Sequence, residues 1–225
     1  MKVLKFGGSS VANTENIKQV LSIVAKTSKK SKVTVVVSAF GKTTNNLIAG
    51  ANEALTDINE AKSILNTIKE LHFQVIEDLV TTNKKQVSEE VNYLFDRLQS
   101  IFEGIFLLQE LSDKTLAKVC SFGERLSSYI IANAAKETLN ATHKDSRDLI
   151  STNDDYLNAQ VNFKITNKNI TAFFDKNKHQ VTLLGGFISS NLDDETTTLG
   201  RGGSDFSAAI YAAALNADEL QIWTD

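Results

Sequence analysis

Apolar runs of strand length alternate with segments of helical periodicity along most of the chain. The runs KVLKF (2–6), KVTVVVSAF (32–40) and HQVTLLGGF (179–187) are predicted to form strands, with a weak strand in NATHKDS (140–146) and a last one in DELQIWTD (218–225). The second run is continuously apolar and rich in β-branched residues, which indicates burial on both of its faces. This pattern favours a parallel sheet covered by helices.

Between the strands, apolar residues recur at helical spacing. A helix capped by Asn13 or Thr14 is predicted by four apolar residues at i, i+3, i+4 and i+7, namely Ile17, Val20, Leu21 and Val24. Residues 43–137 are predicted to be mostly helical, and further helices are expected within 157–177 and over 204–215. Strands separated by helices predict an α/β fold with a largely parallel sheet.

Composition narrows the classes of function. The 225 residues carry a formal net charge of -3, which argues against a nucleic-acid partner. No apolar run approaches the ~20 residues of a membrane span, so no membrane partner is expected. The three histidines lie far apart and do not pair with the single cysteine at metal-ligand spacing, so no metal site is expected. Any anionic ligand must therefore be held by local positive charge.

Glycine-bearing turns follow several of the predicted strands. They are Gly7-Gly8-Ser9, residues 38–41 and Gly185-Gly186. Ligands of open parallel sheets bind beyond the carboxyl ends of strands, and glycine exposes backbone N–H groups that hold phosphate. Each such pair can also be an ordinary tight turn. Lys5 stands two residues before the first turn, where its ammonium either reaches solvent or faces a bound phosphate.

Two further segments carry candidate chemistry. In TTTLGRGGSDFSAA (196–209), three glycines surround Arg201 and lead into Ser204-Asp205 at a predicted helix N-terminus, which favours an anion. Arg201 adds a planar fork that matches a carboxylate or phosphate. In SFGERLSS (121–128), a glycine inside a helical pattern indicates a close approach, and Glu124 is either a site residue or an ordinary salt-bridged one.

The segments KFGGSSVAN, SFGERLSS, TTTLGRGGSDFSAA and IWTD, in this order and spacing, resemble aspartate kinase of the amino-acid kinase fold over the whole chain. The opening and the ELSDKTLAKVCSFGERLS run most resemble the kinase half of bifunctional aspartokinase–homoserine dehydrogenases. The resemblance implies a three-layer αβα sandwich with a largely parallel central sheet. It also implies transfer of the ATP γ-phosphoryl group to the side-chain carboxylate of L-aspartate, the first step of lysine, threonine and methionine biosynthesis.

The resemblance assigns roles to individual residues. Lys5 and Asp205 would be catalytic, with Lys5 on the phosphates and Asp205 organising Lys5. The aspartate pocket would be formed by Ser38, Thr44, Glu124, Arg201 and Ser204. In that pocket Glu124 would take the amino group and Arg201 the α-carboxylate of the substrate. The nucleotide would be held by Lys5, Gly7, Gly8, Ser9, Thr224 and Asp225, with Mg²⁺ carried on ATP and no protein metal site.

The domain organisation is also an expectation from this resemblance. Residues 1–225 would form the amino-acid-binding portion of the catalytic domain and the start of the nucleotide-binding portion. The chain would be truncated at its C-terminus, without regulatory domains, and so bind ATP weakly and be inactive alone. Family members commonly have threonine at the position of Ser9, which keeps the hydroxyl. A cytoplasmic homodimer is expected for the full-length protein.

Two alternatives stay open at this point. One is a kinase of the same fold for another small acceptor, such as glutamate, acetylglutamate or a nucleoside monophosphate. Arg201 together with Glu124 suits an amino-acid zwitterion better than a nucleotide base. The other is a non-catalytic module that binds an anion, against which the pair of Lys5 and Asp205 argues.

Overall fold

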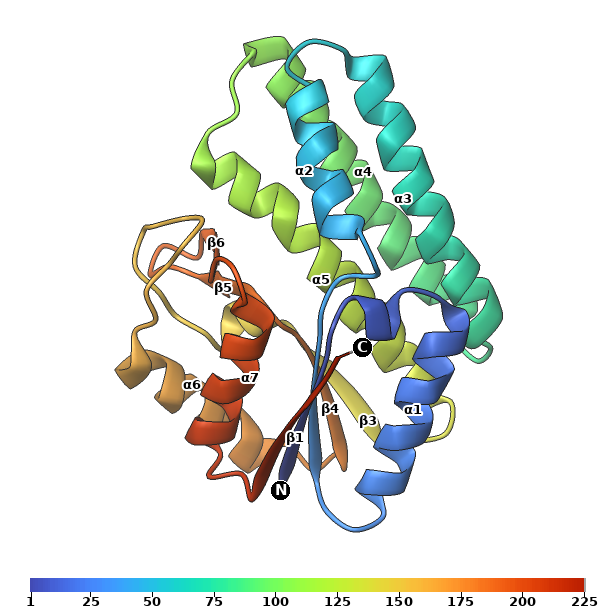
Figure 1. Cartoon of the computed structure of the whole chain (residues 1–225), viewed down its shortest axis with the longest axis vertical. Coiled ribbons are helices and arrows are strands. Elements are labelled where there is room, and N and C mark those ends of the chain that lie inside the picture. The colour runs from blue at the N-terminus through green and yellow to red at the C-terminus, as the bar shows by residue number, and fades with distance from the viewer. Residues whose placement is uncertain (225) are drawn as a thin grey trace.

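The computed structural model describes residues 1–224 and is built around a parallel sheet (Figure 1). The sheet has five strands in the order β3-β4-β2-β1-β7, and every neighbouring pair is parallel. The strands are β1 (Lys2–Phe6), β2 (Val33–Val37), β3 (Ala141–Lys144), β4 (Val181–Gly185) and β7 (Glu219–Trp223). The predicted parallel sheet is confirmed.

Burial on both faces explains the apolar runs. All five residues of β2 and all five of β4 are buried. Neighbouring β2 residues face different cores, because Val35 and Val37 belong to one apolar cluster and Val36 to the other. A strand with helices on both sides needs apolar residues at every position, as the sequence predicted.

Helices cover the two faces and complete an αβα sandwich. On one face lie α1 (Thr14–Ser28) and α5 (Asp113–Lys136), which share a core with β2. On the other face lie α6 (Phe163–Lys176) and α7 (Gly203–Ala214). The Asn13 side chain caps α1 by accepting a hydrogen bond from the backbone N–H of Asn16 at 2.9 Å.

A helical layer extends beyond the sheet at the top of Figure 1. It contains α2 (Thr43–Glu53), α3 (Ile58–Leu79) and α4 (Lys84–Leu108), which pack on one another and on α5. The predicted helical region 43–137 is therefore confirmed. Seven apolar residues of α4 lie buried on one stripe, namely Val87, Val91, Leu94, Phe95, Leu98, Phe102 and Ile105.

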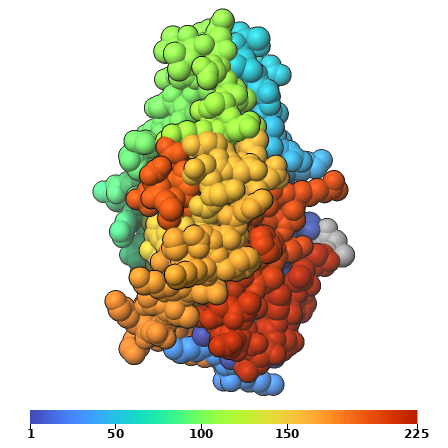
Figure 2. All heavy atoms as spheres, turned by 90° about the vertical axis from the view of Figure 1, so that its left-hand side faces the viewer, coloured from blue at the N-terminus to red at the C-terminus, as the bar shows by residue number. Residues whose placement is uncertain are grey.

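A small antiparallel hairpin was not predicted. It pairs β5 (Ile188–Ser190) with β6 (Thr196–Thr198), so the three threonines before the glycine-rich turn form a short strand. Short 3-10 helices stand at η1 (Ser9–Val11) and η2 (Ser146–Asp148). Figure 2 shows the hairpin, in orange, on the same face as the yellow segment that precedes α6. No helix among residues 1–224 has the length and apolar character needed to cross a membrane.

Candidate active site

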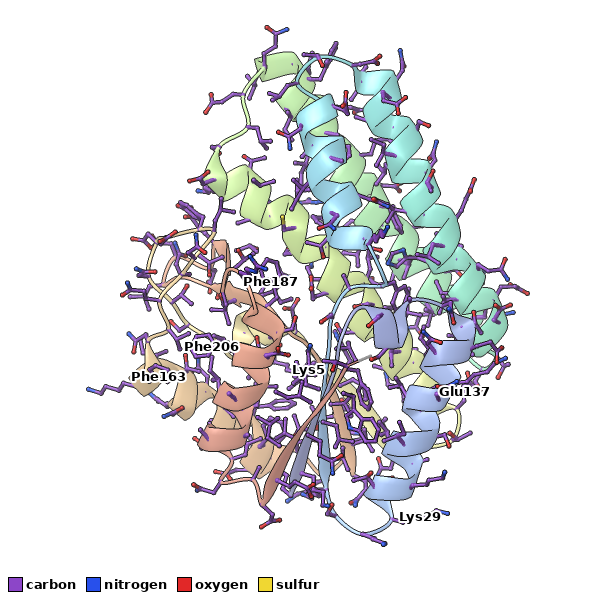
Figure 3. The ribbon with its side chains drawn as sticks, in the orientation of Figure 1. Lys5, Lys29, Glu137, Phe163, Phe187 and Phe206 are labelled. Carbon is purple, nitrogen blue, oxygen red and sulfur yellow. The ribbon has the colours of Figure 1, made fainter. Side chains whose placement is uncertain are left out.

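A cavity of about 340 Å³ opens at the carboxyl ends of β1, β2 and β4. Segments far apart in the chain form its walls, and the N-terminus of α7 closes one side. Figure 3 places Lys5 near the middle of the molecule, between the sheet and α7. The lining residues are Lys5, Gly8, Ser38, Ala39, Gly41, Thr44, Glu124, Phe187, Gly200, Gly202, Gly203, Ser204 and Asp205.

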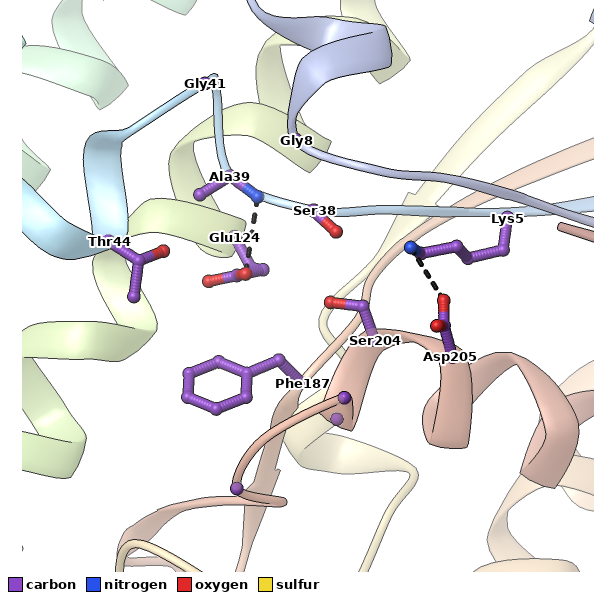
Figure 4. Close-up of a pocket in the computed structure, with 13 residues that line it drawn as sticks. Lys5, Gly8, Ser38, Ala39, Gly41, Thr44, Glu124, Phe187, Ser204 and Asp205 are labelled. Carbon is purple, nitrogen blue, oxygen red and sulfur yellow. Dashed lines mark hydrogen bonds and ion pairs between the residues drawn. The ribbon is translucent and has the colours of Figure 1, made fainter. Parts of the chain in front are cut away.

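Lys5 and Asp205 form an ion pair in this cavity (Figure 4). The distance from Lys5 Nζ to Asp205 Oδ1 is 2.6 Å. The lysine side chain is 8% exposed and the aspartate side chain 47% exposed, so the cation is buried and its partner faces the cavity. A buried cation needs a partner, which Asp205 provides from the first turn of α7. Asp205 therefore holds the Lys5 ammonium in place at the carboxyl end of β1.

Glu124 forms the opposite wall. It is buried in α5, and its Oε1 accepts a hydrogen bond from the backbone N–H of Ala39 at 3.3 Å. Its Oε2 is buried and has no hydrogen-bond partner among residues 1–224. Burial raises the pKa of the Glu124 carboxyl to about 8. The site therefore presents an unsatisfied acid that a positively charged ligand group would complement.

Three hydroxyl groups also line the cavity. Ser38 follows β2, Thr44 lies in the first turn of α2 and Ser204 in the first turn of α7, and all three line the cavity. Figure 4 shows the Ser38 and Ser204 side chains between Glu124 and Lys5. The structure thus brings together four of the five predicted aspartate-pocket residues.

The remaining one, Arg201, lies outside the lining. It is exposed in the turn that precedes α7, where Gly200 and Gly202 adopt positive φ angles of 70° and 75°. No ion pair or side-chain hydrogen bond of Arg201 is found among the described residues. Arg201 therefore has cavity-lining residues on both sides of it in the sequence, but its own side chain does not line the cavity in this conformation.

Glycines set how closely the walls approach. A Cβ on Gly186 would lie 2.8 Å from the Ser204 Cα, and one on Gly185 would lie 3.1 Å from the Glu124 Cβ. A Cβ on Gly123 would lie 2.8 Å from the Ala39 Cβ, which is the close approach that a glycine within this helix indicated. Protein atoms fill the space at Gly185-Gly186, so of the two readings left open for this pair the structure favours close packing over an open phosphate turn.

The first glycine turn has a different environment. Gly8 lines the cavity, and a Cβ on Gly7 would lie 3.5 Å from Lys5 Nζ, so the turn runs beside the ammonium. Ser9 is exposed and begins η1. Thr224 lies elsewhere, against a separate hollow lined by Trp223 and α1 residues. Asp225 lies outside the described residues.

Phe187 lines the cavity without having been predicted, as do Ala39 and Gly41 individually, although both lie in the predicted turn of residues 38–41. Phe187 has a left-handed φ of 65°, and its backbone N–H donates to the Ser207 hydroxyl at 2.8 Å. No pattern in the sequence gives such a backbone conformation for a phenylalanine. Ala39 and Gly41 belong to the turn after β2, which the strand and its Ser-Ala-Phe-Gly ending did indicate.

Comparisons with known proteins agree over the full chain. The bifunctional aspartokinase/homoserine dehydrogenase of Buchnera aphidicola is 32% identical over 231 residues, covering 100% of this chain and 28% of that protein. The chloroplastic aspartokinase 1 of Arabidopsis thaliana is 34% identical, and the match covers 99% of this chain and 40% of that protein. The structure of E. coli aspartokinase III in complex with aspartate and ADP superposes with a TM-score of 0.91 at 30% identity.

The matched share of these proteins is limited. The chain spans 49% of the E. coli chain and less of the other two relatives. The family model of the amino acid kinase family matches residues 1–225. With a parallel αβα fold, a cavity at the carboxyl ends of its strands and this match along its whole length, the chain belongs to the amino acid kinase family.

Proposed function

We propose that the chain is the acceptor-binding and catalytic part of an aspartate kinase, which transfers the γ-phosphoryl group of ATP to the side-chain carboxylate of L-aspartate. The observation that carries this proposal is one cavity that holds the buried Lys5–Asp205 pair and, across from it, the unsatisfied Glu124. Relatives named aspartokinase and the E. coli complex with aspartate and ADP support this choice of substrates.

The reaction asks mainly for positioning and charge stabilisation. An oxygen of the aspartate side chain bonds to the γ-phosphorus, the bond from that phosphorus to the β–γ bridging oxygen breaks, and ADP leaves with the electron pair. The attacking carboxylate is already ionised at neutral pH, so the step needs no general base. Holding the two reactants in line can supply roughly 7–11 kcal/mol of the barrier reduction.

Lys5 is proposed to stabilise the charge that develops on the phosphoryl oxygens. Its buried ammonium acts in a low-dielectric setting, where one fixed electrostatic donor contributes about 3–4 kcal/mol. Asp205 holds that ammonium in place at 2.6 Å. The pairing keeps Lys5 ordered before the substrates arrive, so the catalytic charge does not need to reorganise during the transfer.

Glu124 is proposed to bind the α-amino group of the acceptor. An ammonium beside its free Oε2 satisfies the orphaned oxygen and favours the ionised carboxylate. Ser38, Thr44 and Ser204 supply hydroxyl groups to the remaining polar atoms. Arg201 is proposed to swing from its exposed position and hold the α-carboxylate with its planar fork.

The nucleotide is proposed to enter from the side of the first glycine turn. Gly7 and Gly8 allow the phosphates to approach Lys5. Ser9 and Thr224 lie outside the lining of this cavity and are proposed to contact the rest of the nucleotide. Mg²⁺ is proposed to arrive on ATP as part of the substrate. Residues 1–225 would thus form the amino-acid-binding portion and the start of the nucleotide-binding portion of a cytoplasmic, homodimeric enzyme.

The proposal is tested by trapping the acyl phosphate with hydroxylamine, using residues 1–225 within a full-length aspartokinase polypeptide, because this segment alone is expected to be inactive. L-Aspartate, L-glutamate and N-acetyl-L-glutamate are compared as acceptors in the presence of ATP and Mg²⁺. We expect hydroxamate from L-aspartate, and a loss of about 100-fold or more in turnover for Lys5→Met. Lys2→Met is the matched control, since Lys2 lies on the same strand and pairs with Glu219.

Two results would sink the proposal. Hydroxamate formed faster from glutamate or acetylglutamate than from aspartate would move the acceptor assignment to another kinase of this fold. Equal turnover of Lys5→Met and Lys2→Met would remove Lys5 from the chemistry.

A further inference from the structure

A second cavity, of about 460 Å³, lies on another face of the molecule. It is bounded by α4, α5, η2 and the turn of the β5–β6 hairpin. Figure 2 shows the orange hairpin beneath the green helices on this face. Its lining residues are Tyr93, Arg97, Lys114, Lys118, Phe122, Arg125, Arg147, Asp194, Glu195 and Thr196. Consecutive residues of α5 separate the two cavities, because Glu124 lines the first and Arg125 the second.

The second cavity is strongly basic. Its lining holds five cationic side chains and two carboxylates, although the chain as a whole has a formal charge of -3. Three of the cations lie on one side of α5, since Lys114, Lys118 and Arg125 follow one another at spacings of four and seven residues. Cations on a solvated helix face would point away from other positive charges, whereas these line one cavity with Arg97 of α4 and Arg147 of η2.

Two of the cations are already paired. Lys114 forms an ion pair with Glu195, whose carboxylate also accepts from the Tyr156 hydroxyl at 2.7 Å. Arg147 pairs with Asp145 at 2.7 Å and donates to the Thr196 hydroxyl at 3.1 Å. These contacts tie the hairpin and η2 to the cavity wall and fix its shape.

The other three cations have no such partner. Among residues 1–224, the side chains of Arg97, Lys118 and Arg125 form no ion pair and no hydrogen bond. Arg125 lies over the Phe122 ring, with its guanidinium carbon 4.4 Å from the ring centroid. Burial, with repulsion from Arg147 and Arg97, lowers the pKa of Arg125 to about 10. Like charges held together in a partly buried space are costly unless an anion joins them.

We propose that this cavity binds a small, multiply charged anion that bears phosphate or carboxylate groups. Arg97, Lys118 and Arg125 are the ligands, and Arg147 and Lys114 add positive potential from their paired positions. The volume suits a compact polyanion, because small-molecule sites measure roughly 300–1,000 Å³. Guanidinium forks match phosphate and carboxylate oxygens in geometry, and three unpaired cations favour a ligand with several charges over a single chloride.

The test is calorimetric titration of the protein with tripolyphosphate and, separately, with citrate. These probes distinguish a phosphate from a carboxylate ligand. We expect one ion of at least one kind to bind per chain, with an affinity that falls as NaCl is added. The double variant Arg97→Gln/Lys118→Gln is expected to lose about tenfold or more in affinity for the probe that binds. Both side chains lie at the cavity rather than in the apolar cores, so thermal melting is expected to report a folded variant.

Two further variants locate the binding. Lys29→Gln/Lys85→Gln removes the same charge from exposed positions, and Lys85 is 91% exposed. Lys5→Met removes the buried cation of the first cavity. Both are expected to keep the wild-type affinity to within about twofold. The proposal fails if neither probe binds, if the exposed-lysine variant loses as much affinity as the cavity variant, or if Lys5→Met does.

Discussion

At the scale of single residues, Glu124 is the group with the sharpest physical consequence. A buried carboxyl with one unsatisfied oxygen disfavours its own ionised form, which is why burial raises its pKa to about 8. In the empty cavity near neutral pH the carboxyl is largely protonated. A ligand ammonium beside it reverses the balance, so binding of an amino acid is coupled to release of a proton from this wall.

The raised pKa of Glu124 makes stability depend on pH. The native state keeps a proton that the unfolded state has lost between about pH 4.5 and 8. The stabilising contribution is therefore complete below pH 4.5 and is lost as the pH rises through 8. The wild type should lose stability as the pH is raised from about 5 to about 8.5, whereas Glu124→Gln should not. Over this change of pH we expect the free energy of unfolding of Glu124→Gln to rise by roughly 1–4 kcal/mol relative to that of the wild type.

Urea unfolding at the two pH values measures this difference. Glu110→Gln, which replaces an exposed glutamate just before α5, is the control and should follow the wild type at both. If the free energy of unfolding changed equally with pH in Glu124→Gln and in the wild type, burial would not raise the pKa of this carboxyl as argued.

The residues of the first cavity were predictable to different degrees. Lys5, Asp205 and Glu124 were found because each breaks a local pattern, as a charge at the end of an apolar strand, at a glycine-rich helix start or within an apolar helix. Arg201 was found in the same way but lies outside the cavity lining. Phe187 could not be found, since its left-handed backbone results from the junction of β4, β5 and α7 and not from its neighbours in sequence.

At the scale of elements, Gly186 controls how closely α7 approaches β4. A Cβ there would lie 2.8 Å from both the Cα and Cβ of Ser204. We expect Gly186→Ala to lower the free energy of unfolding by roughly 1–3 kcal/mol, because the start of α7 must shift to admit the methyl group. Denaturant unfolding monitored by circular dichroism measures the change.

Gly104→Ala is the matched control for that substitution. Gly104 lies inside α4, and a Cβ there would have no atom within 4 Å. The same change should therefore stabilise the protein by about 0.5–1 kcal/mol, since alanine is the better helix former. If the two variants shifted stability in the same direction, close packing at Gly186 would not be the controlling factor.

The elements were predictable wherever an apolar pattern ran long enough. Strand β2 is buried on both faces and is therefore continuously apolar, whereas α4 is buried on one face and has apolar residues at helical spacing. The hairpin β5–β6 was missed because its strands are three residues long and mostly Ser and Thr. Its residues pair with the segment before α6 and pack on α5 and η2, and they carry no apolar pattern of their own.

At the scale of the whole molecule, the two cavities depend on segments that meet only in the fold. The carboxyl ends of three parallel strands place Lys5, Ser38 and the Gly185-Gly186 pair at one edge, and α5 and α7 bring Glu124 and Asp205 to it. The basic cavity joins α4, α5, η2 and a hairpin. Sequence reasoning predicted the first meeting from the turns at the carboxyl ends of parallel strands and from the resemblance to aspartate kinase. It had no pattern that linked Arg97 to Arg125 or Arg147.

The central claim is that the first cavity accepts L-aspartate between Glu124 and the α7 end. The most direct measurement is calorimetric titration of L-aspartate into the wild type, Glu124→Gln, Arg201→Ala and the control Lys178→Ala, which removes an exposed charge elsewhere. We expect one aspartate to bind per chain. The affinity should fall about tenfold or more in Glu124→Gln and in Arg201→Ala, and should not change in Lys178→Ala. Binding that neither Glu124→Gln nor Arg201→Ala alters would contradict the account.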